Sequence, residues 1–409
     1  MGVREQVSEI RLDATQLEAV NRACSDARVT LISGPGGSGK STLVKTICER
    51  LEERNEKILL CAFAGKAAAR LREATGRPAS TIHRLLKYDS AKFGASDNEF
   101  ENATICIDEA SMLDSFLLSE VTRRNPKRLV LVGDVAQLPP VGRGAPYSDL
   151  ITLRPDLAVN LTKCYRASEA VYQVSTQIRA GNCPPATLTT PGERWSLIET
   201  GDAKRTQATV LEWVTSDKWD WNTDIVLVPR NGESDDEAST VRGLNRAIAD
   251  AVRPRDWERT KFVVGDRVVN GKNLPLADVW NGTTGTVSAI DIDGGVWVRV
   301  DEPVQAHPGT DDGVMTDRVL FSKTNRKELS LAYALSIHKS QGSQYDKVIV
   351  VCLFKDSHSL LSRSLLYTAV TRARQAAVVC GEVGAFKAGI QKVEQKKTVM
   401  QYLCAQEVK

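Results

Sequence analysis

The sequence of 409 residues lacks the features that mark several specialised classes of protein. The longest apolar run of its second half, Val348 to Phe354, is much shorter than the roughly 20 residues that a membrane-spanning helix needs. The charged start, MGVREQVSEI, contains no apolar segment of the kind found in secretory signals. Repeats and low-complexity tracts are also missing. We therefore expect a globular protein of the cytoplasm.

The nine cysteines offer no metal or redox site in their spacing. The closest two, Cys48 and Cys61, are too far apart in the sequence to form a CxxC unit. We expect all nine to be small buried residues of a protein in a reducing cytoplasm. His83 and His338 have no ligand partner at metal spacing, so zinc binding is not expected.

A large excess of one charge is missing as well. The 54 basic residues nearly balance the 51 acidic ones, and the net charge of +3 does not identify a polyanionic partner. Any surface that binds nucleic acid must therefore be local. The 42% hydrophobic and 26% charged residues are typical of globular proteins, and the length suggests two to four domains of roughly 100 to 200 residues.

Apolar runs alternate with helix-like stretches in two series along the chain. This alternation predicts parallel sheets wound with helices, and two series predict two α/β units. From about Phe262 to Leu320, short β-rich runs broken by Gly, Asn and Asp predict an inserted small barrel, with a hairpin turn at Asp293-Gly294-Gly295. The predicted strands are Val29 to Ile32, Ile58 to Phe63, Thr104 to Ile107 and Leu129 to Val132 in the first series, and Asp224 to Val228, Leu329 to Ser336, Lys347 to Phe354 and Ala376 to Gly381 in the second.

A phosphate-binding loop follows the first predicted strand. The residues GPGGSGKS match the pattern G-x-x-x-x-G-K-[ST] and are followed by the helical LVKTICERLEE. The glycines let backbone N–H groups close around phosphate oxygens, beside the positive end of the helix. Lys40 is expected to reach the β- and γ-phosphates of ATP, and the Ser41 hydroxyl to hold Mg²⁺. The expected nucleotide contacts of this segment are Gly34, Pro35, Gly36, Gly37, Ser38, Gly39, Lys40, Ser41 and Thr42.

Polar residues at the ends of two later strands predict hydrolysis. The segment ICIDEAS places Asp108 and Glu109 at the end of an apolar strand. An aspartate there can bind Mg²⁺ through water, and the neighbouring glutamate can polarise the attacking water. The next strand runs into GDVAQLPPVG, where two prolines stiffen the loop that places Gln137 to sense the γ-phosphate.

Together these motifs resemble those of superfamily 1 helicases, and within them the 5′-to-3′ group that includes RecD-like and Dda-like enzymes. The similarity runs from LDATQLEAV near the start to LLYTAVTRARQAAVVCG near the end. It implies an α/β fold of two RecA-like P-loop domains with ATP between them. The first domain would be 1–158, the second 159–261 and 322–409, and the insertion 262–321 would correspond to the family's SH3-like barrel.

The resemblance also implies further residues of the ATP site. The nucleotide-specificity glutamine of the family falls on Gln16, and Gln341 and Gly342 are further expected nucleotide contacts. The first arginine of the second domain would be Arg166, in NLTKCYRAS, and the arginine finger would be Arg372, in YTAVTRAR. A guanidinium delivered from the opposite domain stabilises charge on the γ-phosphoryl group only when the cleft is closed, which would couple hydrolysis to domain motion.

The nucleic-acid track implied by the resemblance lies in CAFAGKAAARL, TIHRLL and SIHKSQGSQYD. Its mixture of basic and hydroxyl groups suits a grip on the backbone that ignores base sequence. Two positions depart from the family pattern: Phe63-Ala64 replaces Pro-Thr, and Gln344 replaces a glutamate. The expected contacts are Phe63, Lys66, Thr81, His83, Ser336, His338 and Lys339, with Gln341 as a further polar donor.

A β-hairpin pin that splits the duplex is often present in the family, and only Lys87 to Ala103 is available for it here. We expect FGASDNEF to form a reduced pin with Phe93 or Phe100 near its tip or base, the alternative being a flexible polar loop. A solvated helix face, with DNA binding as the alternative, is expected for the lysines of the tail, Lys387, Lys392, Lys396 and Lys397.

The motifs therefore predict an ATP-dependent helicase that uses Mg²⁺, moves 5′ to 3′ on single-stranded DNA and opens duplex DNA. The expected partners are single-stranded DNA and single/double-strand junctions, with replication or recombination proteins as further candidates. A monomer is expected, because both arginines are supplied in cis. An RNA-directed helicase or NTPase is the first alternative, since nothing in the track distinguishes a 2′-OH from hydrogen. The second is a non-catalytic strand-binding scaffold, which the intact hydrolytic residues disfavour.

Overall fold

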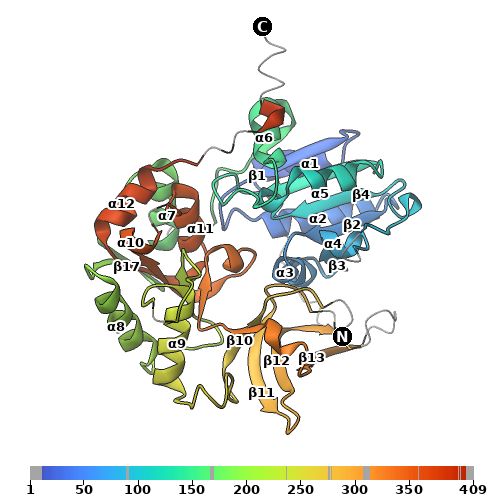
Figure 1. The fold of residues 1–409 in the computed structure, drawn as a ribbon. Helices are drawn as coiled ribbons and strands as arrows, with labels where there is room; N and C mark the ends of the chain where they lie inside the picture. The colour runs from blue at the N-terminus through green and yellow to red at the C-terminus, as the bar shows by residue number, and fades with distance from the viewer. Residues whose placement is uncertain are drawn as a thin grey trace, which may run out of the picture.

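The computed structural model describes residues 12–88, 92–165, 170–235, 237–274, 277, 279–306, 314–357, 359–394, 396 and 398–401. Figure 1 shows two α/β units side by side and a β-rich element that contains β10 to β13 below them. Within these described ranges, no helix is both long enough and apolar enough to cross a membrane.

The first unit is built on a six-stranded sheet in which all neighbouring strands are parallel. The strand order β3-β2-β4-β5-β1-β6 brings the C-terminal ends of β1, β4 and β5 together at one edge. The four strands predicted for the first series are confirmed, with ends within one residue of the prediction. The strands are β1 (Val29–Ser33), β2 (Ile58–Ala62), β3 (Ala79–Thr81), β4 (Thr104–Asp108), β5 (Arg128–Gly133) and β6 (Ala158–Asn160).

Hydrophobic cores cover both faces of this sheet. Alternate residues of β5 point into the two cores, which explains why the strands read as continuous apolar runs. Helices α1, α2 and α3 contribute to one core, and α4, α5 and α6 to the other. The helices are α1 (Ala14–Ala23), α2 (Lys40–Glu52), α3 (Gly65–Thr75), α4 (Ile82–Leu85), α5 (Ser115–Thr122) and α6 (Pro146–Leu153), with short 3₁₀ turns η1 (Asp97–Glu99), η2 (Ala110–Met112) and η3 (Pro155–Leu157).

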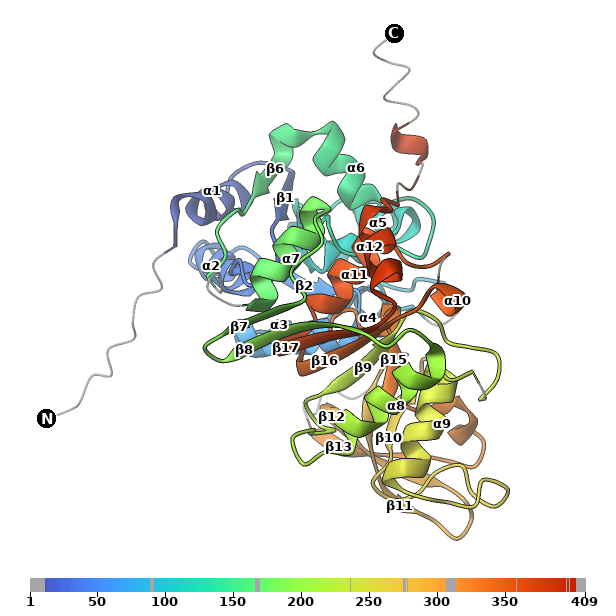
Figure 2. The ribbon, with the colours of Figure 1, turned by 90° about the vertical axis from the view of Figure 1, so that its left-hand side faces the viewer.

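The second unit has a six-stranded sheet of order β15-β9-β16-β17-β8-β7, parallel except for the pair β7–β8 at one edge. Helices α7, α11 and α12 cover one face, and α8 and α9 the other (Figure 2). The strands are β7 (Thr187–Thr190), β8 (Glu193–Glu199), β9 (Ile225–Val228), β15 (Ala334–Ser336), β16 (Tyr345–Cys352) and β17 (Ala373–Gly381). The helices are α7 (Ala170–Ala180), α8 (Ala203–Val214), α9 (Val241–Val252), α10 (Phe354–Ser357), α11 (Arg363–Val370) and α12 (Val383–Gln391), with the 3₁₀ turn η6 (His338–Ser340).

A five-stranded antiparallel sheet of order β13-β12-β11-β10-β14 forms the insertion. The predicted hairpin turn joins β11 to β12, and Gly294 in it has a φ of 80°. In the described part of the insertion, β13 and β14 do not pair with each other, so the sheet is open at this point. The strands are β10 (Arg267–Asn270), β11 (Thr284–Ile290), β12 (Val296–Gln305), β13 (Met315–Phe321) and β14 (Leu329–Leu331), with η5 (Arg326–Glu328) before the last.

The prediction of one strand from Leu329 to Ser336 is wrong. The segment forms two strands in different sheets: β14 pairs with β10 of the insertion, and β15 pairs with β9 of the second unit. Between them the N–H of Ala332 still bonds to the carbonyl of Arg267, whereas Asn245 of α9 binds both backbone groups of Ala334. The chain therefore leaves the insertion within this apolar run. The first sheet also extends beyond 158, because β6 pairs with β1.

Candidate ATP pocket and nucleic-acid cleft

The phosphate-binding loop connects β1 to α2. Gly37 and Gly39 have φ values of 82° and 81°, which glycine adopts without a steric penalty. A Cβ on Gly39 would lie 2.6 Å from Nε2 of Gln16, so a larger residue does not fit there. The Lys40 ammonium donates hydrogen bonds to the carbonyls of Gly34 and Pro35 at 2.7 and 3.0 Å. An ammonium group and a helix N-terminus thus lie together, which suits a polyphosphate.

Gln16 lies against this loop because a capping box at the start of α1 fixes its side chain. Its Oε1 accepts a hydrogen bond from the N–H of Asp13 at 3.1 Å, and its Nε2 donates to the carbonyl of Ser38 at 3.1 Å. The hydroxyl of Tyr165 lies 3.0 Å from the same Oε1. Gln16 and Tyr165 therefore form one wall beside the loop.

Asp108 and Glu109 lie at the end of β4, next to the phosphate-binding loop. The N–H of Glu109 donates to Oδ1 of Asp108 at 2.9 Å. Glu109 has a φ of 53°, a left-handed conformation that is uncommon for residues other than glycine and occurs at functional sites. Burial, and next the Glu109 carboxylate, raise the pKa of Asp108 to about 6. Such a carboxylate is stabilised by a cation, which suits a ligand of Mg²⁺.

The loop after β5 contacts the second unit on both sides of Gln137. The hydroxyl of Tyr367 donates to the Asp134 carboxylate at 2.7 Å, and the N–H of Leu138 donates to Oγ1 of Thr368 at 3.0 Å. Both hydrogen bonds are buried. Because these contacts flank Gln137, any shift of α11 changes the position of this loop.

A pocket of about 650 Å³ lies between the two units. Arg372 enters it from the second unit, and its guanidinium donates to the carbonyls of Thr368 and Ser343, each at 3.2 Å. The side chain is buried, which lowers its pKa, and within the described residues no carboxylate lies at ion-pair distance from it. A buried cation without an anion is costly, so a γ-phosphate fits this place. Of the residues predicted for the ATP site, those that line the pocket are Gly36, Gly37, Gly39, Lys40, Ser41, Thr42, Asp108, Glu109, Gln137 and Arg372.

Six predicted residues of the ATP site within the described ranges do not line this pocket: Gln16, Gly34, Pro35, Ser38, Gln341 and Gly342. Arg166 lies outside the described residues. Gln341 and Gly342 lie apart from this pocket: Gln341 lines a second cavity, and the carbonyl of Gly342 accepts a hydrogen bond from Arg70. Arg70 and Tyr165 do line the ATP pocket, and the sequence analysis missed both. The helical spacing of Arg70 from Lys66 was the available signal.

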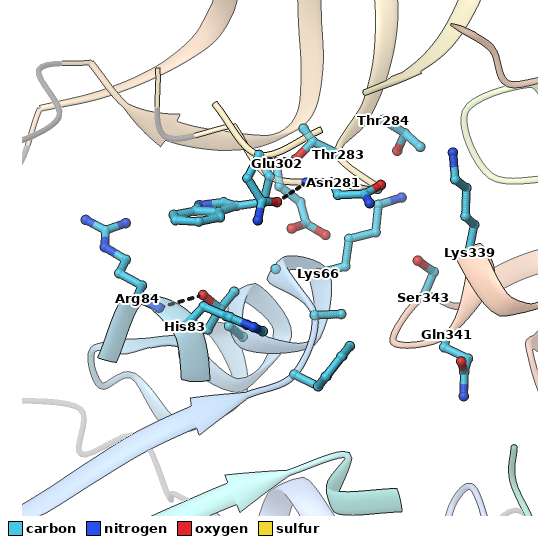
Figure 3. A pocket seen from close by; sticks show the side chains of 18 of the residues that line it. Lys66, His83, Arg84, Asn281, Thr283, Thr284, Glu302, Lys339, Gln341 and Ser343 are labelled. Carbon is cyan, nitrogen blue, oxygen red and sulfur yellow. Dashed lines mark hydrogen bonds between the residues drawn. The ribbon is translucent and has the colours of Figure 1, made fainter. Parts of the chain in front are cut away.

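A second cavity, of about 400 Å³, lies between the first unit, the second unit and the insertion. Figure 3 shows Lys66 and His83 on the first unit, Lys339 and Gln341 across the cavity, and Glu302 from the insertion. We call this cavity the nucleic-acid cleft. Of the residues expected in the track, the cleft is lined by Phe63, Lys66, Thr81, His83, His338, Lys339 and Gln341.

Polar groups of the cleft are held by local contacts. Nζ of Lys66 lies 3.9 Å from Oδ2 of Asp301 in the insertion. Thr81 caps α4, and its hydroxyl accepts the N–H of Arg84 at 3.2 Å. Burial lowers the pKa of His83, which favours the neutral form of this imidazole. Ser336 is an exception to the prediction: it is buried, does not line the cleft, and accepts the N–H of Lys339 at 3.3 Å.

The insertion contributes cleft residues that sequence reasoning missed. Trp280, Asn281 and Thr283 come from the loop between β10 and β11, and Glu302 from β12. An aromatic residue directly before the turn-forming Asn281-Gly282 was the available signal for this loop. The insertion therefore closes one side of the cleft.

The segment expected to form a pin contains no named strand in its described residues. Tyr88 and Phe93 form an isolated antiparallel bridge, and their rings lie 4.8 Å apart. Phe93 also packs against Phe116, with ring centroids 5.7 Å apart. Phe100 is fully buried under the guanidinium of Arg124, so it is not a tip residue. The ring centroids of Tyr88 and Phe93 lie 5.6 and 6.5 Å from that of His83, which lines the cleft.

The lysines of the tail have different environments. Lys387 is exposed on α12, as expected for a helix face, and Lys397 lies outside the described residues. Lys392 is exposed just after α12, and its ammonium donates a hydrogen bond to the carbonyl of Ser359 at 2.7 Å. Lys396 instead donates hydrogen bonds to the carbonyls of Pro140 and Gly142 in the first unit. The segment at Lys396 therefore contacts the loop that carries Gln137.

The fold and the ATP pocket define a P-loop NTPase with two RecA-like domains. A model described as an AAA domain matches residues 11–200, and one described as a UvrD-like helicase C-terminal domain matches residues 331–380. The Pif1 helicase from Bacteroides, solved with ADP-AlF3 and single-stranded DNA, has the same fold, with a TM-score of 0.57, 20% identity and 98% of both chains covered.

Curated relatives identify the family. The ATP-dependent RecD2 DNA helicase of Deinococcus radiodurans is 33% identical over 92% of this chain, and the chain spans half of its length. The RecBCD enzyme subunit RecD of Mycobacterium tuberculosis is 30% identical over 93% of this chain and 72% of its own length. The chain belongs to the RecD-like family of superfamily 1 helicases.

Proposed function

We propose that the chain is an ATP-dependent DNA helicase that moves 5′ to 3′ along single-stranded DNA and unwinds duplex DNA. One observation carries this proposal: the same two RecA-like units form both the ATP pocket and the nucleic-acid cleft. Closure of the units on nucleotide therefore moves two sets of strand contacts relative to each other, as a translocating motor requires. The direction follows from the 5′-to-3′ group that the motifs resemble.

At the ATP pocket, residues of the first unit bind the nucleotide, and arginines of the second unit sense its γ-phosphate. ATP supplies the phosphoanhydride bond whose hydrolysis drives the cycle. Gln16 and the loop glycines position the nucleotide, Lys40 neutralises the phosphates, and Ser41 and Asp108 hold Mg²⁺. Glu109 polarises the attacking water. Three groups sense the γ-phosphate: Gln137 of the first domain, and Arg166 and Arg372 of the second.

In the cleft, cations and hydroxyls of both units contact the DNA backbone. Lys66 acts from the first unit and Lys339 from the second, and Phe63 stacks on a base. The insertion acts as the family's SH3-like element and keeps the strand in the cleft. Phe93, with the ring of Tyr88, takes the place of the pin at the duplex junction. We propose domain limits at 1–158, 159–261 with 322–409, and 262–321. Two strands depart from these limits: β6 extends the first sheet to Asn160, and β14 pairs with the sheet of the insertion.

The test is strand separation on partial duplexes that carry a single-stranded tail at the 5′ or the 3′ end. With ATP and Mg²⁺, we expect unwinding from the 5′ tail only, and none for Lys40→Ala. Lys45→Ala, on the same helix but outside the pocket, is the matched control and should unwind normally. Unwinding only from the 3′ tail would overturn the direction. Absence of unwinding from either DNA tail, with unwinding from an RNA tail, would favour the RNA-directed alternative.

A further inference from the structure

Helix α3 reaches from the nucleic-acid cleft to the ATP pocket. Lys66, in its first turn, lines the cleft, whereas Arg70 lines the ATP pocket. Residues four apart lie on one face of a helix, about 6 Å along its axis. One rigid helix therefore carries a strand contact at its start and a cation of the ATP pocket one turn later.

Arg70 contacts both halves of the ATP pocket. Its Nη2 lies 3.8 Å from Oε1 of Glu109 in its own unit, and the same nitrogen donates a hydrogen bond to the carbonyl of Gly342 in the second unit. Its Nε is buried and has no partner among the described residues. The guanidinium thus connects the Glu109 carboxylate, which is expected to polarise water, with the Gly342 loop of the opposite unit.

The loop at Gly342 packs tightly on the start of α3. Gly342 has a φ of 76°, and a Cβ added to it would lie 3.1 Å from the Cβ of Ala64. This loop follows η6, which carries His338 and Lys339 of the nucleic-acid cleft. Arg70 is therefore connected to cleft residues of both units, to Lys66 through α3 and to His338 and Lys339 through the Gly342 loop.

The charges around Glu109 fit a positioning role. Arg70 approaches from the first unit and Arg372 from the second, and both line the same pocket. Burial lowers the pKa of Arg372, while the charge of Glu109 raises it and that of Arg70 lowers it further, as expected for three groups at close range. Two arginines from opposite units therefore interact electrostatically with the Glu109 carboxylate.

We propose that Arg70 is a positioning residue that orients the Glu109 carboxylate and links this orientation to the strand in the cleft. A strand bound at Lys66 and Lys339 fixes α3 against the Gly342 loop, and Arg70 then holds Glu109 in the geometry that activates water. This accounts for stimulation of hydrolysis by DNA, and it rests on the proposed function. Arg70 binds neither nucleotide nor DNA in this account.

The test compares Arg70→Ala, Arg70→Lys and the control Arg77→Ala, which lies just past the end of α3 and pairs with Glu52 outside both cavities. The quantities are kcat and KM for ATP, with and without oligo(dT), and the Kd for oligo(dT). We expect Arg70→Ala to lower the DNA-stimulated kcat by about 10- to 100-fold, a part of what a general base contributes. KM and Kd should change by less than about 3-fold, because ground-state binding is not involved. Arg70→Lys, which keeps the charge but not the fork, should recover part of the rate.

A double-mutant comparison separates positioning from a merely structural role. If Arg70 acts through Glu109, Arg70→Ala should lower the residual rate of Glu109→Gln by no more than about 2-fold, since residues that act as a unit are not additive. Equal losses in the wild-type and Glu109→Gln backgrounds would overturn the proposal, as would a stimulated kcat of Arg70→Ala within about 2-fold of wild type. If Arg70→Ala does not fold, Arg70→Gln decides by the same criteria. Absence of DNA stimulation in the wild type would instead refute the proposed function.

Discussion

At the scale of single residues, Arg372 and Asp108 lie on the two sides of the ATP pocket, the first buried and the second half-buried. Arg372 is 3% exposed, and burial raises the pKa of Asp108 to about 6. Each group would be costly without a partner of opposite charge. An anionic phosphate for Arg372 and a cation for Asp108 meet both needs at once, so the electrostatics of the pocket favour bound Mg²⁺ and nucleotide.

Glu56 provides a pH-dependent test of how the first unit is stabilised. Its carboxylate accepts hydrogen bonds from Arg128 and from Lys127, the latter at 2.7 Å, and these contacts lower its pKa from 4.5 to about 2. Because the folded pKa lies below the unfolded one, the stabilisation is complete above pH 4.5 and is lost as the pH falls towards 2. Glu56→Gln should lower the free energy of unfolding at pH 7 by about 1–3 kcal/mol.

Urea unfolding of Glu56→Gln and wild type at pH 7 and at pH 3.5 measures this effect. The difference between the two proteins should shrink at the lower pH. Glu53→Gln, at an exposed position three residues earlier, is the control and should change stability little at either pH. A difference that is independent of pH would contradict the assignment.

At the scale of elements, the loop between β10 and β11 brings Trp280 into the nucleic-acid cleft. An aromatic ring there can stack on a base of any identity. Trp280→Ala should therefore weaken binding of single-stranded DNA by about 1–3 kcal/mol, or roughly 5- to 150-fold in Kd. Fluorescence anisotropy with labelled oligo(dT) measures the change. Trp297→Ala, in β12 of the same sheet and outside the cleft, is the matched control; equal effects of the two substitutions would argue against stacking.

Elements whose signals are local could be predicted from the sequence. The strands before the phosphate-binding loop and before Asp108 are continuous apolar runs, because both faces of the sheet are covered. The split within Leu329 to Ser336 could not be predicted, since it depends on which strand each half pairs with. Arg70 and Trp280 were missed for a related reason: their roles arise where separate parts of the chain meet. Of the two positions considered for Phe100, its burial leaves only the base of the segment.

At the scale of the whole molecule, the contacts between the two RecA-like units lie next to the ATP pocket. Asp134 bonds to Tyr367, Leu138 to Thr368, and Arg70 to Gly342. The nucleic-acid cleft is formed by the same two units together with the insertion. Binding and loss of the γ-phosphate can therefore change the cleft without any direct contact between nucleotide and strand.

The steady-state rate of ATP hydrolysis, measured with and without oligo(dT) for wild type and Arg372→Ala, tests the central claim most directly. We predict that the DNA stimulates the wild type, and that Arg372→Ala lowers the stimulated kcat by about 10³-fold or more, as loss of an arginine finger does. KM for ATP should change little, because the γ-phosphoryl charge develops in the transition state. A wild-type rate that does not respond to DNA, or an Arg372→Ala variant that keeps the stimulated rate, would contradict the account.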